Sequence, residues 1–283
     1  MAVVAASWTA LLFILPASIS AVRLNDQFQV EENHNDIDWS TTANPAGRNV
    51  VTEAQDQGGH CNSCYVWAAV GSIESRAAIE SGEEEPMQLS VQQALDCARK
   101  SHMDDIGKGK LAYLSSRGCS TGFPKPILQY AVDEGFMLAS DYPVPYSIKG
   151  SAARDGPCEV DSDKIAWNPS DWKVKQATKR DTWETNVMKA LAEGPVAIGI
   201  AKDSHGLGSD PEVRAGGIAT TECKSQANDH AVLLVGFGEM DGKPYWKIRN
   251  SWGSVWGDHG FFKIPRGSNF CGAETTAAWL EKR

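Results

Sequence analysis

The sequence lacks an excess of positive charge, and after its first residues it lacks long apolar runs. The 283 residues include 27 basic and 36 acidic side chains, which gives a formal net charge of −9. Surfaces that bind nucleic acid are basic, so we expect no nucleic-acid partner. Beyond residue 21 no run approaches the roughly 20 apolar residues that cross a bilayer. We therefore expect no membrane contact for the mature chain.

The first 21 residues lack charged side chains. Met1 to Ala21 contain an apolar run at 11–15, and small residues follow it. This pattern predicts a signal peptide at 1–21, because the alternative, a membrane anchor, needs a longer run. Residues 22–35 are polar and acidic, which predicts a short flexible lead-in or propeptide. We expect the secretory pathway, with a lysosome- or vacuole-like compartment or the extracellular medium as destination.

Internal repeats and low-complexity tracts are absent, and the two halves of the chain differ in pattern. Apolar residues recur at helical spacing in the first half, whereas short strand-like runs dominate after about residue 165. The predicted helices are 63–80, 90–97, 126–134 and 181–193. The predicted strands are 196–200, 230–237, 245–249 and 260–264. A polar stretch at 98–118 predicts a surface insertion.

This order of elements predicts an α+β domain of two lobes at 36–283. We expect a helical lobe at about 52–165 and a β-rich lobe at about 166–283. Clefts between lobes are common ligand sites, so the functional site is expected between them.

The number of cysteines is odd. The seven cysteines are Cys61, Cys64, Cys97, Cys119, Cys158, Cys223 and Cys271. Cysteines pair in an oxidising compartment, so one thiol is left over. We assign the free thiol to Cys64, because this residue opens a predicted helix whose N-terminal partial charge favours the reactive thiolate.

A thiol nucleophile needs a base, and a histidine is suited to this role. Of the six histidines only His230 begins an apolar strand, and Asn250 is a candidate to orient its ring. Other interpretations stay open at this point. Cys61 and Cys64 form a CxxC, which also suits a redox pair or half of a zinc site, although a second CxxC and an HxxxH are missing. Taken alone, His230 also suits a core histidine and Asn250 a turn.

Three segments, in this order, carry a specific pattern. They are Gln57-Gly58-Gly59-His60-Cys61-Asn62-Ser63-Cys64-Tyr65, Asp229-His230-Ala231 and Arg249-Asn250-Ser251-Trp252-Gly253. Together they resemble the cathepsin-like members of the papain-like cysteine peptidases, whose histidine and asparagine follow the cysteine by about 130–150 residues. Here the separations from Cys64 are 166 and 186 residues, and the insertion at 98–118 accounts for part of the excess. The resemblance implies the papain-like fold, with a cleft between a helical and a β-rich lobe.

The resemblance also implies a role for each matching position. Cys64 would form a thioester with the substrate, His230 would act as acid and base, and Asn250 would orient the imidazole. Gln57 would donate to the oxyanion together with the Cys64 backbone N–H. Trp252 would shelter the bond between the histidine and the asparagine from water. The implied disulfides are Cys61–Cys119, Cys97–Cys158 and Cys223–Cys271.

Further positions are implied for substrate binding. They are Gly122, Phe123, Gly199, Ala231 and Thr276, with Trp252 beside them. Gly122 would bind the substrate backbone, and the uncharged set predicts an apolar side chain two residues before the scissile bond. The implied partners are peptide or protein substrates and a protein inhibitor, and the expected optimum is mildly acidic. No metal ion and no organic cofactor is implied.

The chain departs from the family pattern around the nucleophile. One additional residue separates Gln57 from Cys61, Asn62 replaces the usual glycine, and Ser120-Thr121-Gly122 keeps one glycine of the usual Asn-Gly-Gly. The lead-in at 22–35 is much shorter than the usual inhibitory propeptide. Two alternatives to an active peptidase follow, namely a catalytically silent homologue that binds peptides or protein partners, and a thiol–disulfide oxidoreductase. The choice between endo- and exopeptidase action stays open.

Overall fold

The computed structural model describes residues 36–98, 116–144, 156–202 and 206–283. All of them belong to the unit His34–Arg283. The predicted signal peptide, the lead-in and residues 99–115 of the predicted insertion lie outside the described residues. At the described ends of the insertion Ala98 and Gly118 are buried and Arg117 is exposed, and for the rest the surface segment stays a prediction. Ser116 is buried, with its hydroxyl 3.2 Å from that of Tyr65.

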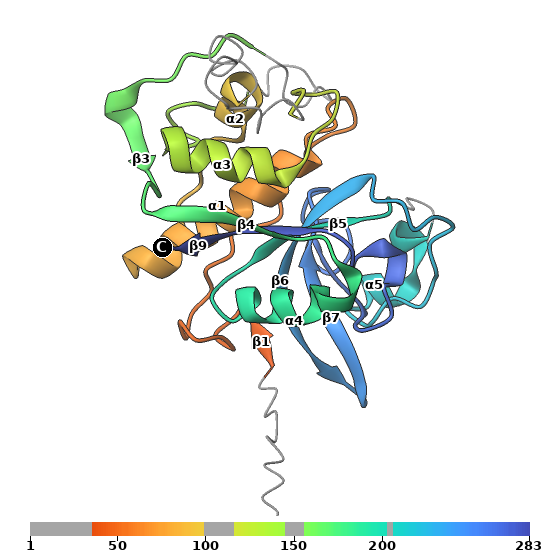
Figure 1. Ribbon diagram of the computed structural model, residues 1–283. Helices are drawn as coiled ribbons and strands as arrows, with labels where there is room; N and C mark the ends of the chain where they lie inside the picture. Colours follow the sequence, from red (N-terminus) through yellow and green to blue (C-terminus); the bar gives the residue numbers. More distant parts are fainter. Residues whose placement is uncertain (1–35, 99–115, 145–155, 203–205) are drawn as a thin grey trace, which may run out of the picture. The chain divides into compact units, whose positions relative to one another are not determined.

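The helix α1, Cys64–Ser81, packs against α3 and the strand β6 (Figure 1). It is buried on most sides, because small and apolar residues occupy most of its turns, and it ends before Gly82 as predicted. Ser63 occupies the N-cap position of α1. The side chain of Ser63 makes no capping hydrogen bond, and its hydroxyl instead accepts from Trp67 Nε1 at 3.2 Å. The first turn of α1 nevertheless carries Cys64.

Three further predicted helices are present, with small differences at their ends. The helix α2 is Val91–Cys97, and the Ser90 hydroxyl caps it by accepting from the Gln93 N–H at 2.9 Å. The helix α3 is Pro124–Glu134. It begins two residues earlier than predicted, because proline suits the first helical turn. The helix α4 is Arg180–Leu191 and ends two residues earlier than predicted.

An antiparallel sheet runs in the order β4-β9-β5-β6-β7-β8, and β1 pairs with β6. Its strands are β1 (Ile37–Asp38), β4 (Trp172–Ala177), β5 (Val196–Ile200), β6 (His230–Met240), β7 (Lys243–Arg249), β8 (Phe261–Pro265) and β9 (Ala277–Lys282). The sequence predicts β5 to the residue and most of β6, β7 and β8. It misses β4 and β9, because lysine and alanine, which are common there, are depleted in strands.

Short elements connect these parts. They are β2 (Phe136–Met137), which pairs with β3 (Ile165–Trp167), the helix α5 (Pro211–Arg214), and 3₁₀ turns at Ser162–Lys164, Leu207–Ser209 and Phe270–Gly272. None of the helices in the described ranges is long and apolar enough to cross a membrane.

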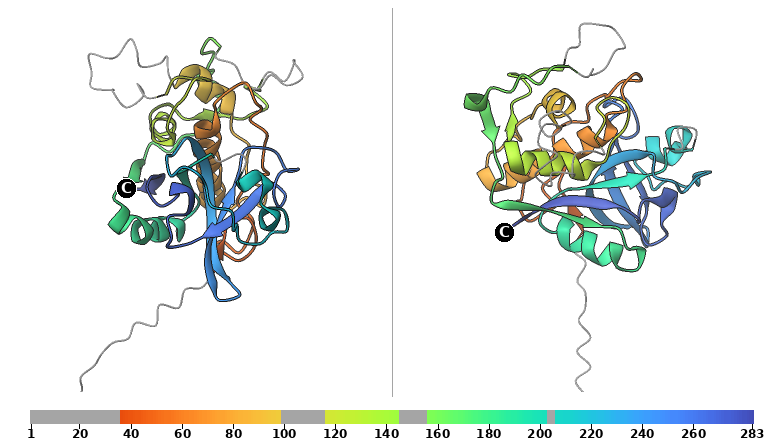
Figure 2. Two further views of the ribbon diagram at one scale, coloured as in Figure 1. Left: turned by 90° about the vertical axis from the view of Figure 1, so that its right-hand side faces the viewer. Right: turned by 45° about the horizontal axis from the view of Figure 1, so that its top comes forward.

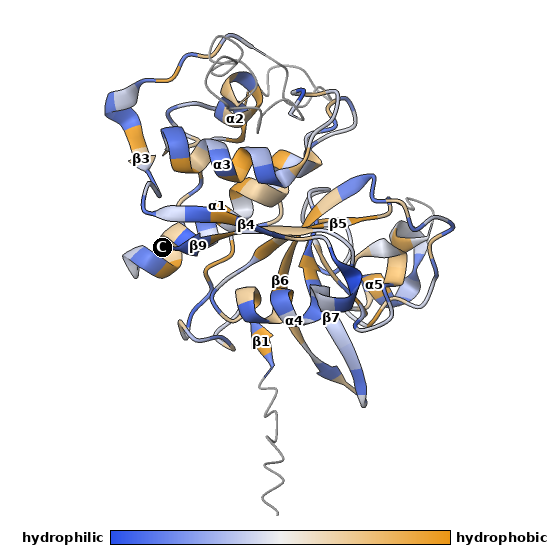
Figure 3. Ribbon diagram, viewed as in Figure 1, coloured by the Kyte–Doolittle hydropathy of each residue, from blue (hydrophilic) through white to orange (hydrophobic). Residues whose placement is uncertain are grey.

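Buried apolar residues form two clusters. One lies among α1, α2 and α3, and the other lies between the sheet and α4. Figures 1 and 2 show α2 and α3 on one side, β6, β7 and β8 on the other, and α1 between them. Figure 3 shows apolar residues along β5 and β6, whereas the far end of the β6–β7 hairpin is hydrophilic. The predicted α+β class is confirmed, and the residue bounds of the two lobes stay a prediction.

Three disulfides fasten the fold. They are Cys61–Cys119, Cys97–Cys158 and Cys223–Cys271, which are the pairs that the resemblance implies. Each bridge stabilises the folded chain by about 2–4 kcal/mol, largely by restricting the unfolded chain. Disulfides also fit an oxidising compartment.

The pairing of the cysteines bears on the alternatives for the CxxC. Cys61 is bonded to Cys119 and Cys64 is free, which contradicts a Cys61–Cys64 redox pair. Among the described residues, no group of three or more His, Cys, Asp or Glu side chains is placed to hold a metal ion.

Candidate active site

Cys64 stands at the start of α1, half-buried, and is the free thiol of the chain. Its sulfur accepts hydrogen bonds from the backbone N–H groups of Tyr65 and Ala231. Ala231 is the second residue of β6, so this contact brings the thiol to the end of the strand that begins with His230. Two segments that are 166 residues apart in sequence therefore meet at one point.

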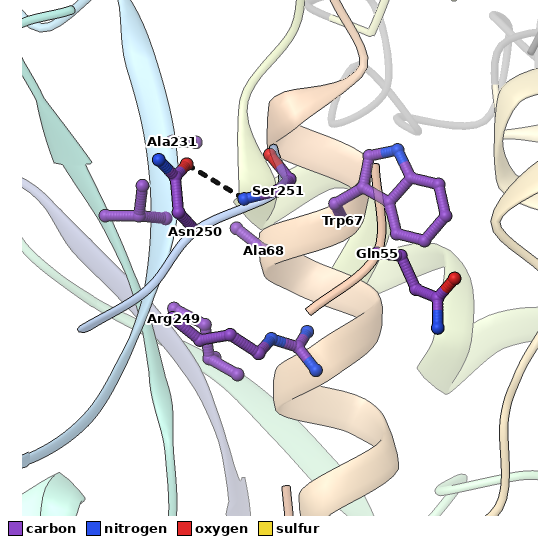
Figure 4. A pocket seen from close by; sticks show the side chains of 9 residues that line it. Gln55, Trp67, Ala68, Ala231, Arg249, Asn250 and Ser251 are labelled. Atoms are coloured by element: carbon purple, nitrogen blue, oxygen red, sulfur yellow. Dashed lines mark hydrogen bonds between the residues drawn. The ribbon is translucent and has the colours of Figure 1, made fainter. Parts of the chain in front are cut away.

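His230 is buried and bonded to Asn250, with 2.9 Å between Nε2 and Oδ1. The same oxygen accepts from the Ser251 backbone N–H at 2.8 Å, the bond drawn in Figure 4 within a small pocket that Asn250, Ser251 and Ala231 help to line. A backbone N–H can only donate, so this bond fixes which end of the Asn250 amide is the oxygen. His230 Nε2 must therefore donate, which leaves Nδ1 as the basic nitrogen of the neutral ring.

Trp252 covers the imidazole. Its ring stacks on that of His230, with 4.9 Å between centroids and 21° between planes. Trp256 meets Trp252 edge-on at 5.1 Å and meets Phe262 at 5.3 Å, which ties the indole to the core. The tryptophan therefore limits the access of water to the histidine and holds the ring plane in place.

Gln57 is fixed by contacts at both ends of its amide. Its Oε1 accepts from the Ser251 hydroxyl at 2.6 Å, and its Nε2 donates to the Cys61 carbonyl at 3.3 Å. The backbone N–H of Gln57 also donates to the Ser251 carbonyl at 2.9 Å. The additional residue between Gln57 and Cys61 thus leaves the glutamine buried beside the loop that carries Asn250.

Burial dominates the charge state of the two reactive groups. It raises the pKa of the Cys64 thiol, which the two N–H bonds to the sulfur partly offset. It lowers the pKa of His230 to about 4, against the opposing effect of Asn250. The charges of Lys202 and Asp229 also act on both groups, and the effect of Lys202 is the larger at each. At neutral pH the thiol is therefore protonated and the imidazole is neutral, with its proton on Nε2, so the thiol proton can move from sulfur to Nδ1.

The segment around Gly122 forms a wall next to the helix that carries Cys64. A Cβ atom on Gly122 would lie 2.4 Å from the ring of Tyr65, so a glycine is needed there for packing alone. The next side chain, Phe123, is 63% exposed, which is unusual for a large apolar group. Asn62 bridges toward this wall, because its Nδ2 donates to the Ser120 carbonyl at 3.2 Å.

Three of the predicted substrate positions come together at one end of the sheet. Gly199 pairs with Ala231 across β5 and β6, and its N–H donates to the Thr276 carbonyl at 3.1 Å. Asn228 joins them, since its Nδ2 donates to the Thr276 hydroxyl at 2.9 Å. Asn228 therefore adds a polar group to a set that the sequence presents as uncharged and largely apolar.

Sequence reasoning assigned no role to Ser251, Asn228 or Lys202. The sequence did hint at a role for Ser251, because this residue stands between the candidate orienter Asn250 and Trp252. No indication of a role for Asn228 or Lys202 is present in the sequence, since the position of each depends on how the ends of β5 and β6 pair. By contrast, the structure brings together Cys64, His230 and Asn250 from three distant segments.

A free thiol at a helix start, beside a histidine that an asparagine orients, is the arrangement of cysteine–histidine nucleophilic sites. The family model described as "Papain family cysteine protease" matches residues 34–280, so the chain belongs to the papain family of cysteine proteases. Its fold is accordingly the papain-like α+β fold.

Relatives and solved structures agree with this assignment. A pro-cathepsin H of Mus musculus is 30% identical over 268 residues, which cover 93% of this chain and 70% of the relative. The probable cysteine protease RD19C of Arabidopsis thaliana is 34% identical over 234 residues, covering 80% and 56%. This chain thus spans little more than half the length of that relative. The proform of the ragweed pollen protease Amb a 11 has a TM-score of 0.69 at 27% identity, and the match covers 90% of this chain and 67% of that one. Procathepsin L 3 of Tenebrio molitor has a TM-score of 0.64 at 28% identity, and the match covers 87% of this chain and 69% of that one.

Proposed function

We propose that this chain hydrolyses peptide bonds with Cys64 as the nucleophile. The observation that carries the proposal is the free thiol held at the start of β6, where Asn250 leaves Nδ1 of His230 as the base. His230 takes the thiol proton, and the sulfur attacks the peptide carbonyl carbon. The C–N bond then breaks, the imidazolium protonates the departing amine, and a thioester remains on Cys64.

Water completes the cycle. His230 takes a proton from a water molecule, and the resulting hydroxide attacks the thioester carbonyl. The C–S bond breaks, a carboxylic acid leaves, and the proton on the imidazole restores the Cys64 thiol. In both steps the Gln57 Nε2 and the Cys64 backbone N–H would donate to the negatively charged oxygen. Ser251 favours this role for Gln57, because it fixes the rotamer of the amide before substrate arrives.

The substrate would lie along the wall at Gly122 and Phe123. The backbone of Gly122 would hold the substrate main chain, and the exposed Phe123 ring would contact its side chains. Gly199, Ala231 and Thr276 would form the pocket for an apolar side chain two residues before the scissile bond. A protein inhibitor could bind along the same wall at Gly122 and Phe123. The protein would act in a lysosome-like compartment or outside the cell.

Activity should show a broad plateau against pH in place of the mildly acidic optimum that the resemblance implies, because the pKa of His230 is lowered and that of the Cys64 thiol is raised. Near pH 4 the imidazole takes up a second proton, because the pKa of His230 is lowered to about 4, and the base is lost. On the alkaline side the Cys64 thiol loses its proton only above the ordinary cysteine pKa of about 8.5, because burial raises its pKa, and the departing amine can then no longer be protonated. We expect kcat/KM for a neutral peptide to fall on the acid side near pH 4. An acid limb above pH 6, with tryptophan fluorescence unchanged, would contradict this assignment.

The proposal is tested by chemical labelling of the mature protein with an epoxysuccinyl inhibitor of thiol peptidases at about pH 5.5. We expect rapid modification that peptide mass mapping places on Cys64, since the six other cysteines are in disulfides. A His230→Ala variant should react much more slowly. Absence of labelling in the folded protein would refute an active peptidase.

A silent peptide-binding homologue is the second candidate, and Asn62 favours it. This exposed side chain stands two residues before Cys64 and bonds across to the Ser120 carbonyl, where it would narrow the path of the substrate. The labelling experiment separates the two candidates, because a silent homologue has no activated thiolate.

A further inference from the structure

The end of β5 carries a lysine to the rim of the site. Ile200 of β5 pairs with His230 at the start of β6. Two residues further on, the backbone N–H of Lys202 donates to the carboxylate of Asp229, the residue that precedes His230. Both Lys202 and Asp229 are exposed. Lys202 is thus anchored by its backbone next to His230, while its side chain is exposed.

The pairing of β5 and β6 shows on which side of the imidazole Lys202 lies. Gly199 and Ala231 form the neighbouring pair on the other side of His230. At roughly 3.3 Å per residue, Gly199 and Lys202 are about 10 Å apart along the chain. In the proposed reaction the acyl part of the substrate lies toward Gly199, and the departing amine lies at the imidazole. Lys202 therefore faces the leaving group.

The local charge favours an anion at this position. In the described part of the chain, no ion pair engages the Lys202 ammonium. Lys202 outweighs Asp229 in its effect on both Cys64 and His230, so the net potential from these two charges is positive at the site. The carboxylate of Asp229 is also occupied by the Lys202 N–H. Among the described residues, Lys202 therefore attracts an anionic group on the substrate more strongly than Asp229 repels it, although the chain as a whole carries a net charge of −9.

We propose that Lys202 binds a carboxylate on the leaving-group side of the scissile bond and so determines part of the specificity. This inference rests on the proposed peptidase function and names a feature of its substrate. The carboxylate has two sources, namely an acidic side chain on the second residue after the scissile bond or the terminal carboxylate of a dipeptide leaving group. Because an exposed ion pair is weak, we expect a preference of about 3- to 5-fold.

The test uses four peptides with the same acyl side. Two are amidated at the C-terminus and carry glutamate or glutamine as the second residue after the scissile bond, and two share a dipeptide leaving group with a free or an amidated terminus. We expect a higher kcat/KM for the carboxylate member of at least one pair, and a smaller difference at high salt. Lys202→Gln should remove the preference and Lys202→Glu should invert it. Lys243→Gln is the matched control, because Lys243 pairs with Met240 at the far end of β6 from His230 and is exposed.

The two pairs identify the source of the carboxylate. A preference in the glutamate pair alone indicates cleavage within longer chains, and a preference for the free terminus alone indicates removal of residues from the C-terminus. Equal rates within both pairs, or a preference that persists in Lys202→Gln, would overturn the inference while the peptidase function stands.

A binding measurement decides the inference even if no peptide is cleaved. In that case the proposed function fails, and the same peptides are titrated against the Cys64→Ala protein by fluorescence anisotropy. Tighter binding of the carboxylate members, lost in Cys64→Ala/Lys202→Gln, supports the role of Lys202. Equal affinities refute it.

Discussion

Replacing Cys64 by alanine should abolish peptide hydrolysis while leaving the fold intact. The thiol is the free one in the chain, and its sulfur is held by the N–H groups of Tyr65 and Ala231 beside His230. Without it there is no atom to form the thioester. We expect kcat to fall by roughly 10⁶-fold, the size of effect seen when a nucleophile is removed from a catalytic unit. Steady-state hydrolysis of a fluorogenic peptide measures the loss, and the thermal midpoint checks that the variant folds.

The double variant Cys64→Ala/His230→Ala is the sharper control. If the two residues act as one catalytic unit, the loss of the thiol already removes the contribution of His230 to the rate. The double variant should then keep the residual rate of Cys64→Ala. An additional large loss in the double variant would mean that His230 acts independently of the thiol. Cys64→Ala with near-normal turnover would refute the assignment of the nucleophile altogether.

Glu74→Gln should destabilise the protein strongly although the side chain keeps its shape. Glu74 is buried in α1, where its carboxylate accepts from the Thr52 hydroxyl at 2.6 Å and from the Leu89 N–H at 2.8 Å. The guanidinium of Arg249 donates to the same threonine. Burial raises the pKa of Glu74 and lowers that of Arg249, and the charge of each residue partly offsets the shift of the other. Removing the negative charge leaves a buried cation without compensation. We expect the free energy of unfolding in urea to fall by about 3–5 kcal/mol.

The matched control removes both charges. Glu74→Gln/Arg249→Met should be less destabilised than Glu74→Gln, because no uncompensated ion stays in the interior. A loss below about 1 kcal/mol for the single variant would show that solvent reaches the pair and screens it. Activity should fall with stability in the single variant, since Arg249 directly precedes Asn250.

Much of the fold follows from local patterns. The helix at Cys64–Ser81 is visible as a run of apolar and small residues, and β5 as the apolar run Val196–Ile200 bounded by Gly194-Pro195. The errors arise where local preference and tertiary packing disagree. The strand Trp172–Ala177 pairs with Ala277–Lys282, and neither segment has a strong strand propensity. Each therefore becomes a strand through the backbone hydrogen bonds that it forms with its neighbours in the sheet.

Gly71 illustrates a residue whose reason lies wholly in packing. In the sequence it is a residue of low helix propensity inside a predicted helix. In the structure a Cβ atom at this position would lie 1.9 Å from Arg249 Nη2, so the glycine makes room for the buried guanidinium. No property of residues 64–81 alone indicates this requirement.

The sequence by itself determined the chemistry available to this protein. The reactive groups can be identified from residue type and local secondary structure alone. They are an unpaired cysteine at the start of a helix, a histidine at the start of an apolar strand and an asparagine that follows in the sequence. Only the tertiary structure decided how these groups act together. The hydrogen bond of Ser251 to Gln57, the tautomer that Asn250 imposes on His230 and the position of Lys202 beside the imidazole all depend on contacts between distant segments. Such contacts are set by strand pairing and helix packing, which no local pattern records.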